Sequence, residues 1–263
     1  MKIIFTFFVS FLVFASSLVA FSGTSKHTFL SSPPAKLSAY LVAKPQDPSI
    51  VKSNLEGYGF KVLSSYSPYP GKTVISITNS ELKKTGTFMA VINVLVSKSE
   101  VRVQNPSYLG AAYLGKKYHY GQFKNTVNML KGVLGELYNV KEALAFDDLK
   151  HYHFMFGMPY FADMITISNS PKQPKSALYK LKLPNGNTIV GHKLANNSFL
   201  KKIKQTKNAA LLPYQSMITS SKVVILHPKY YLALSLPLLK MGNFMTISSA
   251  PGEIEDEIKK AYN

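Results

Sequence analysis

The sequence predicts an α+β protein built from two similar two-layer domains, each an antiparallel sheet with helices packed on one face. The first observation is an internal repeat, in which residues 87–114 match residues 209–236 without a gap. Each copy also contains two apolar strands joined by a short polar turn, a pattern typical of antiparallel pairing. Both copies then pass through Asn-Pro or His-Pro into an aromatic, alanine-rich helix.

The elements of the first copy follow from apolar periodicity and turn residues. Asp47 and Pro48 predict the start of a helix that runs to Gly57, because aspartate caps helices well and proline suits the first turn. The other expected elements are a strand at 37–45, a strand at 59–71, a strand with a short amphipathic helix at 72–84, the two strands and helix of 87–114, and a longer helix at 119–138.

The second copy is expected to repeat this order. Residues 151–159 are matched to the strand 37–45, residues 176–186 to 59–71, and residues 187–202 to 72–84. The stretch that follows the first of these strands, 160–175, contains two prolines and is poor helix material. Acids early and lysines late predict a closing helix at 251–262. The boundary is expected near residues 140–150, which gives domains at 23–145 and 146–263.

Residues 1–22 are predicted to be a cleavable signal peptide. Lys2 precedes an apolar stretch from Ile3 to Ala20, and Ala20-Phe21-Ser22 places small side chains at both recognition positions of signal peptidase. The stretch is near the minimum length for a membrane span, so retention as an N-terminal anchor is the alternative. The protein is therefore expected to be periplasmic or secreted.

Composition narrows the chemistry and the partners. The chain contains no cysteine, which excludes disulfides, thiol catalysis, cysteine-ligated metal sites and a lipoprotein anchor. The formal net charge is +18, and Arg102 is the single arginine among 31 basic residues. Because arginine is favoured for bidentate phosphate recognition, a lysine excess is weaker evidence for a nucleic-acid partner than the net charge suggests, and the expected export argues against such a partner. It favours weak association with an anionic membrane or cell-envelope polymer.

Two stretches resemble the small domain catalogued as domain of unknown function 302. "AALLPYQSMITSSKVVILHP" (209–228) is similar to the C-terminal half of that domain, and "LEGYGFKVLSSYS" (55–67) to its helix and Gly-Phe strand. The resemblance implies a two-layer α+β fold, often dimeric, with no established activity. Tyr214 stands where that family usually has cysteine, so any thiol or metal chemistry of that cysteine is absent here. A two-domain chain would then form internally the pair that single-domain members form by dimerising.

The stretch "HYHFMFGMPYF" (151–161) is the sharpest candidate site. On a strand, His151, His153 and Met155 would share one face, with Met158 close by. Imidazole and thioether ligands suit copper and haem iron. The alternative is an apolar core strand, because the matched strand 37–45 is apolar on both faces and methionine is a flexible core filler.

Tyr214 and His227 complete the set of candidate ligand-binding residues. His227 replaces Asn105 before the proline that begins the helix, and histidine is a poorer cap than asparagine. This difference is interpreted either as a local role, such as a ligand or a pH-sensitive contact, or as drift in a duplicated copy.

The function expected from these features is that of a non-enzymatic binding or interaction protein that is exported. No P-loop, GxSxG, HExxH or EF-hand pattern occurs, and carboxylates are scarce, which favours binding over catalysis. The ligand, a small molecule or a protein, is expected in the cleft between the two copies. One alternative is a periplasmic copper- or haem-handling protein that uses His151–Met158. The other is a hydrolase whose residues converge only in three dimensions.

Overall fold

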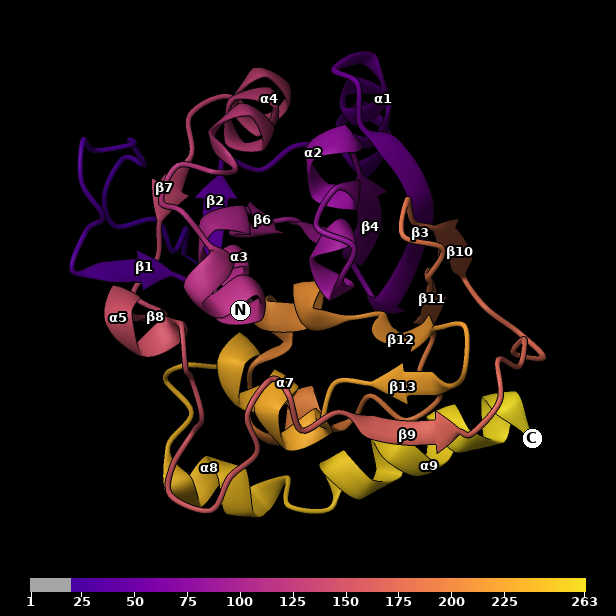
Figure 1. Cartoon of the computed structure of the whole chain (residues 1–263). Helices are drawn as coiled ribbons and strands as arrows, with labels where there is room; N and C mark the ends of the chain where they lie inside the picture. Colours follow the sequence, from indigo (N-terminus) through magenta and orange to yellow (C-terminus); the bar gives the residue numbers. More distant parts are fainter. Residues whose placement is uncertain (1–19) are drawn as a thin grey trace, which may run out of the picture.

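The computed structural model describes residues 20–263 and confirms the α+β class (Figure 1). Most of the predicted signal peptide, residues 1–19, lies outside the described residues. Two large sheets and one small sheet are present in the described part, and every strand pair in them is antiparallel. We use "first half" for residues 20–149 and "second half" for residues 150–263.

The first half contains a six-stranded sheet. Its strands, in their order across the sheet, are β3 (Lys61–Tyr69), β4 (Lys72–Thr78), β5 (Ile92–Ser97), β6 (Val101–Gln104), β2 (Tyr40–Ala43) and β7 (Tyr138–Asn139). Its helices, in chain order, are α1 (Pro48–Gly57), α2 (Ser80–Lys83), η1 (Phe88–Ala90), α3 (Pro106–Leu114), η2 (Gly115–Lys117), α4 (Lys124–Leu134) and α5 (Phe146–Leu149). A small pair of strands, β1 (Lys36–Ser38) and β8 (Ala143–Ala145), lies beside it.

Local sequence explains these helix ends. The side chains of Asp47 and Asn105 cap α1 and α3, and a proline follows each cap, as predicted. The helix expected at 119–138 is shorter, because Gly121 and Gly135 on either side of α4 both adopt positive φ angles. Such angles suit glycine and end a right-handed helix.

The second half contains a five-stranded sheet. Its strands, in their order across the sheet, are β10 (Tyr179–Lys182), β11 (Thr188–His192), β12 (Tyr214–Ile218), β13 (Val223–Ile225) and β9 (Ile165–Ser168). Its helices, in chain order, are α6 (Phe199–Lys202), η3 (Thr206–Leu211), α7 (Pro228–Ser235), α8 (Met241–Thr246) and α9 (Ala250–Tyr262). The closing helix predicted at 251–262 corresponds to α9, which contacts both β9 and α7.

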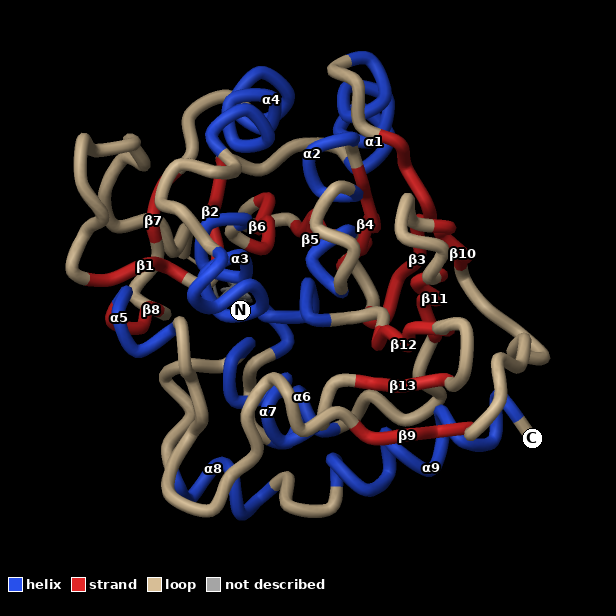
Figure 2. The backbone as a smooth tube through the Cα atoms, in the orientation of Figure 1, coloured by secondary structure: helices blue, strands red, loops and turns tan. Residues whose placement is uncertain are grey.

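Both sheets share one strand order, since β3-β4-β5-β6-β2 corresponds position by position to β10-β11-β12-β13-β9. The strand expected at 151–159 is wrong. That stretch forms turns and loop, visible between α5 and β9 in Figure 2, and β9 takes the corresponding place in the sheet. Gly157 has a φ angle of +77° there, and Phe156 is fully exposed, neither of which suits a buried strand.

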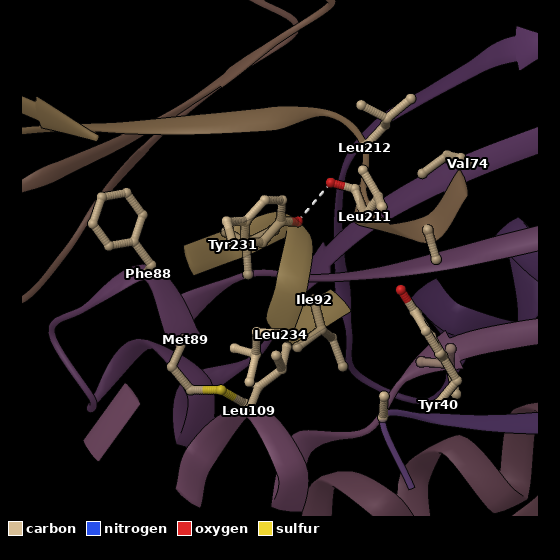
Figure 3. Close-up of a cluster of buried hydrophobic side chains, with 14 of the residues drawn as sticks. Tyr40, Val74, Phe88, Met89, Ile92, Leu109, Leu211, Leu212, Tyr231 and Leu234 are labelled. Carbon is tan, nitrogen blue, oxygen red and sulfur yellow. Dashed lines mark hydrogen bonds between the residues drawn. The ribbon is translucent and has the colours of Figure 1, made fainter. Parts of the chain in front are cut away.

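The two halves are packed together through one continuous apolar core. Figure 3 shows part of it, where Tyr40, Val74, Ile92 and other side chains of the first half surround Leu211 and Tyr231 of the second half. The Tyr231 hydroxyl donates a hydrogen bond to the Leu211 carbonyl at 2.5 Å. At the sheet edges, β3 and β10 lie side by side (Figure 1).

Segment η3 of the second half covers one face of the first sheet. The side chains of Asn93 and Arg102 bond to the Ala210 carbonyl and to Asn208 in this segment. Val94 and Val103 point to the opposite face by strand alternation and are also buried. Both faces of β5 and β6 are therefore buried, and the polar residues on the covered face, Asn93 and Arg102, have hydrogen-bond partners in η3.

Two tyrosines at matched positions make reciprocal contacts across the junction. The Tyr108 hydroxyl donates to the Leu234 carbonyl at 2.7 Å, and the Tyr230 hydroxyl donates to the Ala112 carbonyl at 3.4 Å. In the alignment of 87–114 with 209–236, Tyr108 matches Tyr230 and Ala112 matches Leu234. Residue i contacting j while j contacts i is the pattern of an isologous two-fold interface. The contacts are those expected of a duplicated domain, which stays a prediction.

The junction also contains a buried ionic network centred on Arg102. This fully buried guanidinium bonds Glu100 Oε1 at 2.9 Å, Asn208 Oδ1 at 2.9 Å and Ser22 Oγ at 2.7 Å. Its Nη1 lies 3.6 Å from Glu142 Oε1, which Lys207 also contacts at 2.6 Å. Burial acts to raise the pKa of Glu142, but the two nearby cations outweigh burial and lower that pKa.

Two cavities touch both halves, and the larger has a volume of about 300 Å³ and is lined by residues 112–115 and by residues from 150–152 and 160–162. The smaller has a volume of about 60 Å³ and lies at the edge of the junction, beside Glu142, Lys207, Asn208 and Leu239. Such a volume holds ordered water but is far below the 300–1,000 Å³ that is roughly typical of ligand pockets.

Within residues 20–263, none of the helices combines the length and the hydropathy that a membrane-crossing segment needs.

Candidate functional site

A cavity lies in the second half, where the end of α9 meets the segment before β10 and the end of β11. It has a volume of about 510 Å³, within the range typical of small-ligand pockets. Its lining residues come from the segment before β10, from the end of β11 and from the last turns of α9, and they are Lys175, Ser176, Ala177, Leu178, His192, Lys193, Glu257, Ile258, Lys260 and Ala261.

Three exposed lysines give this cavity a positive charge. Lys175, Lys193 and Lys260 line it from three separate segments of the chain. Glu257 is the one carboxylate side chain among the lining residues, and it accepts hydrogen bonds from the backbone N–H groups of Ala195 and Asn196. Because three lysine side chains line the cavity against one carboxylate, the lining carries an excess of positive charge.

A chain of buried hydrogen bonds forms the floor of the cavity. His192 Nε2 lies 2.7 Å from Ser216 Oγ, and Ser216 Oγ lies 2.6 Å from the Tyr262 hydroxyl. Burial lowers the pKa of His192 to about 4 and raises the pKa of Tyr262 to about 12. All three groups are therefore neutral at pH 7, and they hold β11, β12 and α9 together behind the lysines.

This arrangement favours binding over nucleophilic catalysis. A serine and a histidine within hydrogen-bond distance are the first requirement of a hydrolase dyad. Ser216, however, has no solvent exposure, so a ligand in the cavity does not reach its Oγ atom. A histidine whose pKa is about 4 is also a weak general base at neutral pH.

The charge of the second half extends well beyond the cavity. Residues 164–252 contain no aspartate or glutamate. The same stretch contains twelve lysines, which are Lys172, Lys175, Lys180, Lys182, Lys193, Lys201, Lys202, Lys204, Lys207, Lys222, Lys229 and Lys240. This asymmetry produces a positive field that attracts anions toward this half of the molecule.

The predicted His/Met site is a loop. His151 is exposed and lines a separate hollow of about 300 Å³, together with Lys150, Tyr152 and Tyr160. His153 Nδ1 lies 2.7 Å from the Met155 carbonyl oxygen, and its ring packs against Tyr160.

The two methionines of this loop lie on either side of its turn. Met155 is exposed, Met158 is half-buried, and the Met158 N–H donates to the Met155 carbonyl at 3.0 Å. The shared strand face on which the metal hypothesis rested is therefore wrong. Copper or haem handling at this stretch stays a prediction.

Tyr214 and His227 have structural contacts in the fold. Tyr214 is buried, its hydroxyl donates to the Leu226 carbonyl at 2.5 Å, and its ring packs edge-on against Tyr231. His227 Nδ1 accepts a hydrogen bond from the Lys229 N–H at 3.2 Å and so caps α7, in the way that Asn105 caps α3. The cap is preserved by imidazole, which accounts for His227 without a ligand.

The lysine-lined cavity was not predicted from the sequence, because its parts are far apart along the chain. Lys175, Lys193 and Lys260 look like ordinary solvated lysines, and His192 looks like the polar end of a strand. The one sequence signal that points toward them is the long stretch without acids.

No known protein family, curated protein or solved structure matches the chain. The resemblance to domain of unknown function 302 therefore remains a prediction. Within residues 20–263, no group of three or more His, Asp or Glu side chains is placed to hold a metal ion.

Proposed function

We propose that this chain is an exported, non-enzymatic binding protein that holds a small anionic ligand in its lysine-lined cavity. The observation that carries the proposal is the cavity itself, which is lined by Lys175, Lys193 and Lys260 and by a single carboxylate side chain that is hydrogen-bonded to backbone N–H groups. The ligand class is a molecule with two or more phosphate or carboxylate groups.

Two features support that ligand class. Ammonium groups bind anions as point charges on flexible stems, so three separated lysines fit several negative charges without a fixed bidentate geometry. The stretch 164–252 carries twelve lysines and no acid, against four acids in α9, so the net charge of this half favours anion entry and speeds association at low salt. Export rests on the predicted signal peptide, and the proposed role is compatible with an anionic component of a cell envelope.

Calorimetric titration tests the proposal directly. Pyrophosphate and citrate serve as probes for the full chain, and we expect saturable binding that weakens as salt rises. The triple variant Lys175→Gln, Lys193→Gln, Lys260→Gln should bind the better probe at least about tenfold more weakly, because each lost ion pair in a partly enclosed site removes a favourable interaction.

A matched control separates the cavity from general charge. The triple variant Lys202→Gln, Lys222→Gln, Lys229→Gln removes the same charge from exposed positions outside the cavity lining. We expect it to bind almost as the unmodified chain does. Equal losses in both triple variants, or no saturable binding of either probe, would contradict the proposal. A long polyphosphate chain as a third probe distinguishes a polymer from a small ligand.

A further inference from the structure

Exposed apolar side chains gather on one region of the second half. Ten large hydrophobic side chains are strongly exposed in residues 20–263, and six of them lie in the segments 155–160 and 238–245. We call these six the apolar tip, and they are Met155, Phe156, Tyr160, Leu238, Met241 and Met245. Clusters of this kind on a soluble surface mark sites of interaction, whereas isolated exposed apolar residues need no explanation.

The two segments of the apolar tip are in contact. The rings of Phe154 and Phe244 stack with their centroids 5.5 Å apart, which joins the loop to α8. Figure 1 shows the loop between α5 and β9 running alongside α8 at the lower left. Met241 and Met245 are four residues apart on α8 and so share one face of it.

The apolar tip protrudes. Phe156 is 100% exposed, and Gly157, with its φ angle of +77°, follows it in the turn. A large apolar side chain that makes no contacts within its own chain is suited to insertion into a lipid bilayer or into a deep pocket of a partner. Exposed phenylalanine and methionine side chains on a surface loop and a short surface helix are typical of segments that insert into the interfacial layer of a bilayer.

The net charge of the chain, +18, favours an anionic bilayer. Helix α8 belongs to the stretch 164–252, which has twelve lysines and no acid, and Lys240 directly precedes α8. On the loop side, Asp147 pairs with Lys150 at 3.7 Å, and Asp148 and Asp163 are the other acids of residues 146–163. Lysines close to a bilayer surface add attraction to anionic headgroups.

We propose that the apolar tip docks this protein on anionic lipid membranes, with Phe156 inserted among the acyl chains. Initial attraction comes from the lysines of the second half, and retention comes from burial of the apolar tip. This inference stands independently of anion binding in the lysine-lined cavity.

The absence of tryptophan from the chain gives a direct test. The full-length Phe156→Trp variant carries a single fluorescent reporter at the tip, and Tyr58→Trp places the same reporter at an exposed position on the first half. Both variants keep the same N-terminal residues, so any anchoring by that segment is equal in the two.

With vesicles of mixed phosphatidylglycerol and phosphatidylcholine, the Phe156→Trp emission should shift to shorter wavelength. Lipids brominated on their acyl chains should quench it at least about twofold more than they quench Tyr58→Trp. The effect should fall sharply with phosphatidylcholine alone and at high salt. Equal quenching of the two reporters, or none, would overturn the proposal.

The competing occupant is a second copy of the chain. Sedimentation without lipid distinguishes it, using the unmodified chain and the Phe156→Ser variant. A monomer in both cases is expected. A dimer that Phe156→Ser converts to a monomer would overturn membrane docking and assign the apolar tip to a subunit interface.

Discussion

The two halves of this chain arrange their strands in the same order but surround them differently. In the first half, α1 connects β2 to β3, η3 covers one sheet face, and β7 extends the edge beyond β2. In the second half, a proline-containing segment replaces the α1 connection, and the edge strand β9 is only half-buried. The sheet of the first half is therefore covered beyond β2, while the second half exposes the lysine-lined cavity and the apolar tip.

The same strand order therefore supports a buried ionic network in one half and exposed candidate binding surfaces in the other. Covering both faces of the first sheet places a buried arginine and two buried carboxylates at the junction, where Arg102 contacts Asn208 and Glu142 contacts Lys207 of the second half. The loops and helix ends around the second sheet are exposed, and they carry the cavity lysines and the apolar tip.

The largest expected effect comes from breaking the junction in the first half. Arg102→Ala should lower the free energy of unfolding by about 3–5 kcal/mol, because it leaves Glu100 and Glu142 buried with less compensation. Urea unfolding measures the loss.

Val224, the position in the second half that matches Arg102, is the control for that variant. Val224→Ala removes only buried methyl groups and should cost about 1–2 kcal/mol. Equal losses in the two variants would show that the Arg102 network contributes no more than ordinary packing.

The next largest effect is a pH dependence that belongs to the second half. Burial lowers the pKa of His192 to about 4, below its value of about 6.5 in the unfolded chain. The unfolded state therefore binds more protons than the folded state between about pH 4 and pH 6.5. This group's contribution is fully present above about pH 6.5 and is lost as pH falls toward 4, for a total of about 3 kcal/mol.

His192→Gln sharpens that measurement, because glutamine can still bond Ser216 but does not titrate. Unfolding free energies of both proteins should be measured from pH 7.5 to pH 4. The unmodified chain should lose its stability advantage over the variant as pH falls. Parallel profiles would mean that His192 titrates alike in the folded and unfolded states.

The smallest expected effect tests the reciprocal tyrosines. Tyr108→Phe should cost about 1 kcal/mol, because it leaves the buried Leu234 carbonyl without this donor. Tyr230→Phe should cost less, since its hydroxyl lies 3.4 Å from the Ala112 carbonyl compared with 2.7 Å for the other pair. Thermal unfolding of both variants provides the comparison, and the reverse order would refute this ranking.

Local patterns predicted most of the elements, because the forces that form them act over short distances. Asp47 with Pro48, and the proline that follows Asn105, predicted helices that the structure confirms. The match of 87–114 with 209–236 predicted the two strand pairs and the helices after them. The strand predicted at 151–159 is wrong, because a short apolar stretch resembles a strand even where Gly157 turns the chain.

The candidate site was beyond local patterns. The three cavity lysines are brought together by tertiary packing of α9 against the sheet, which no short window of sequence encodes. The roles of Arg102 and His192 likewise depend on distant partners, namely Asn208 and Glu142 for the arginine, and Ser216 for the histidine. The metal-site prediction for the His/Met stretch rested on residue type, whereas the structure shows an exposed apolar surface there.

The most direct test of the central claim, that the second half carries the anion-binding surface, is hydrogen–deuterium exchange of the full chain with and without pyrophosphate. Peptides covering 175–193 and 257–263 should exchange more slowly when pyrophosphate is present. Peptides covering 61–84, which also contain lysines, should be unchanged. Slower exchange spread equally over both halves, or confined to 61–84, would contradict the account.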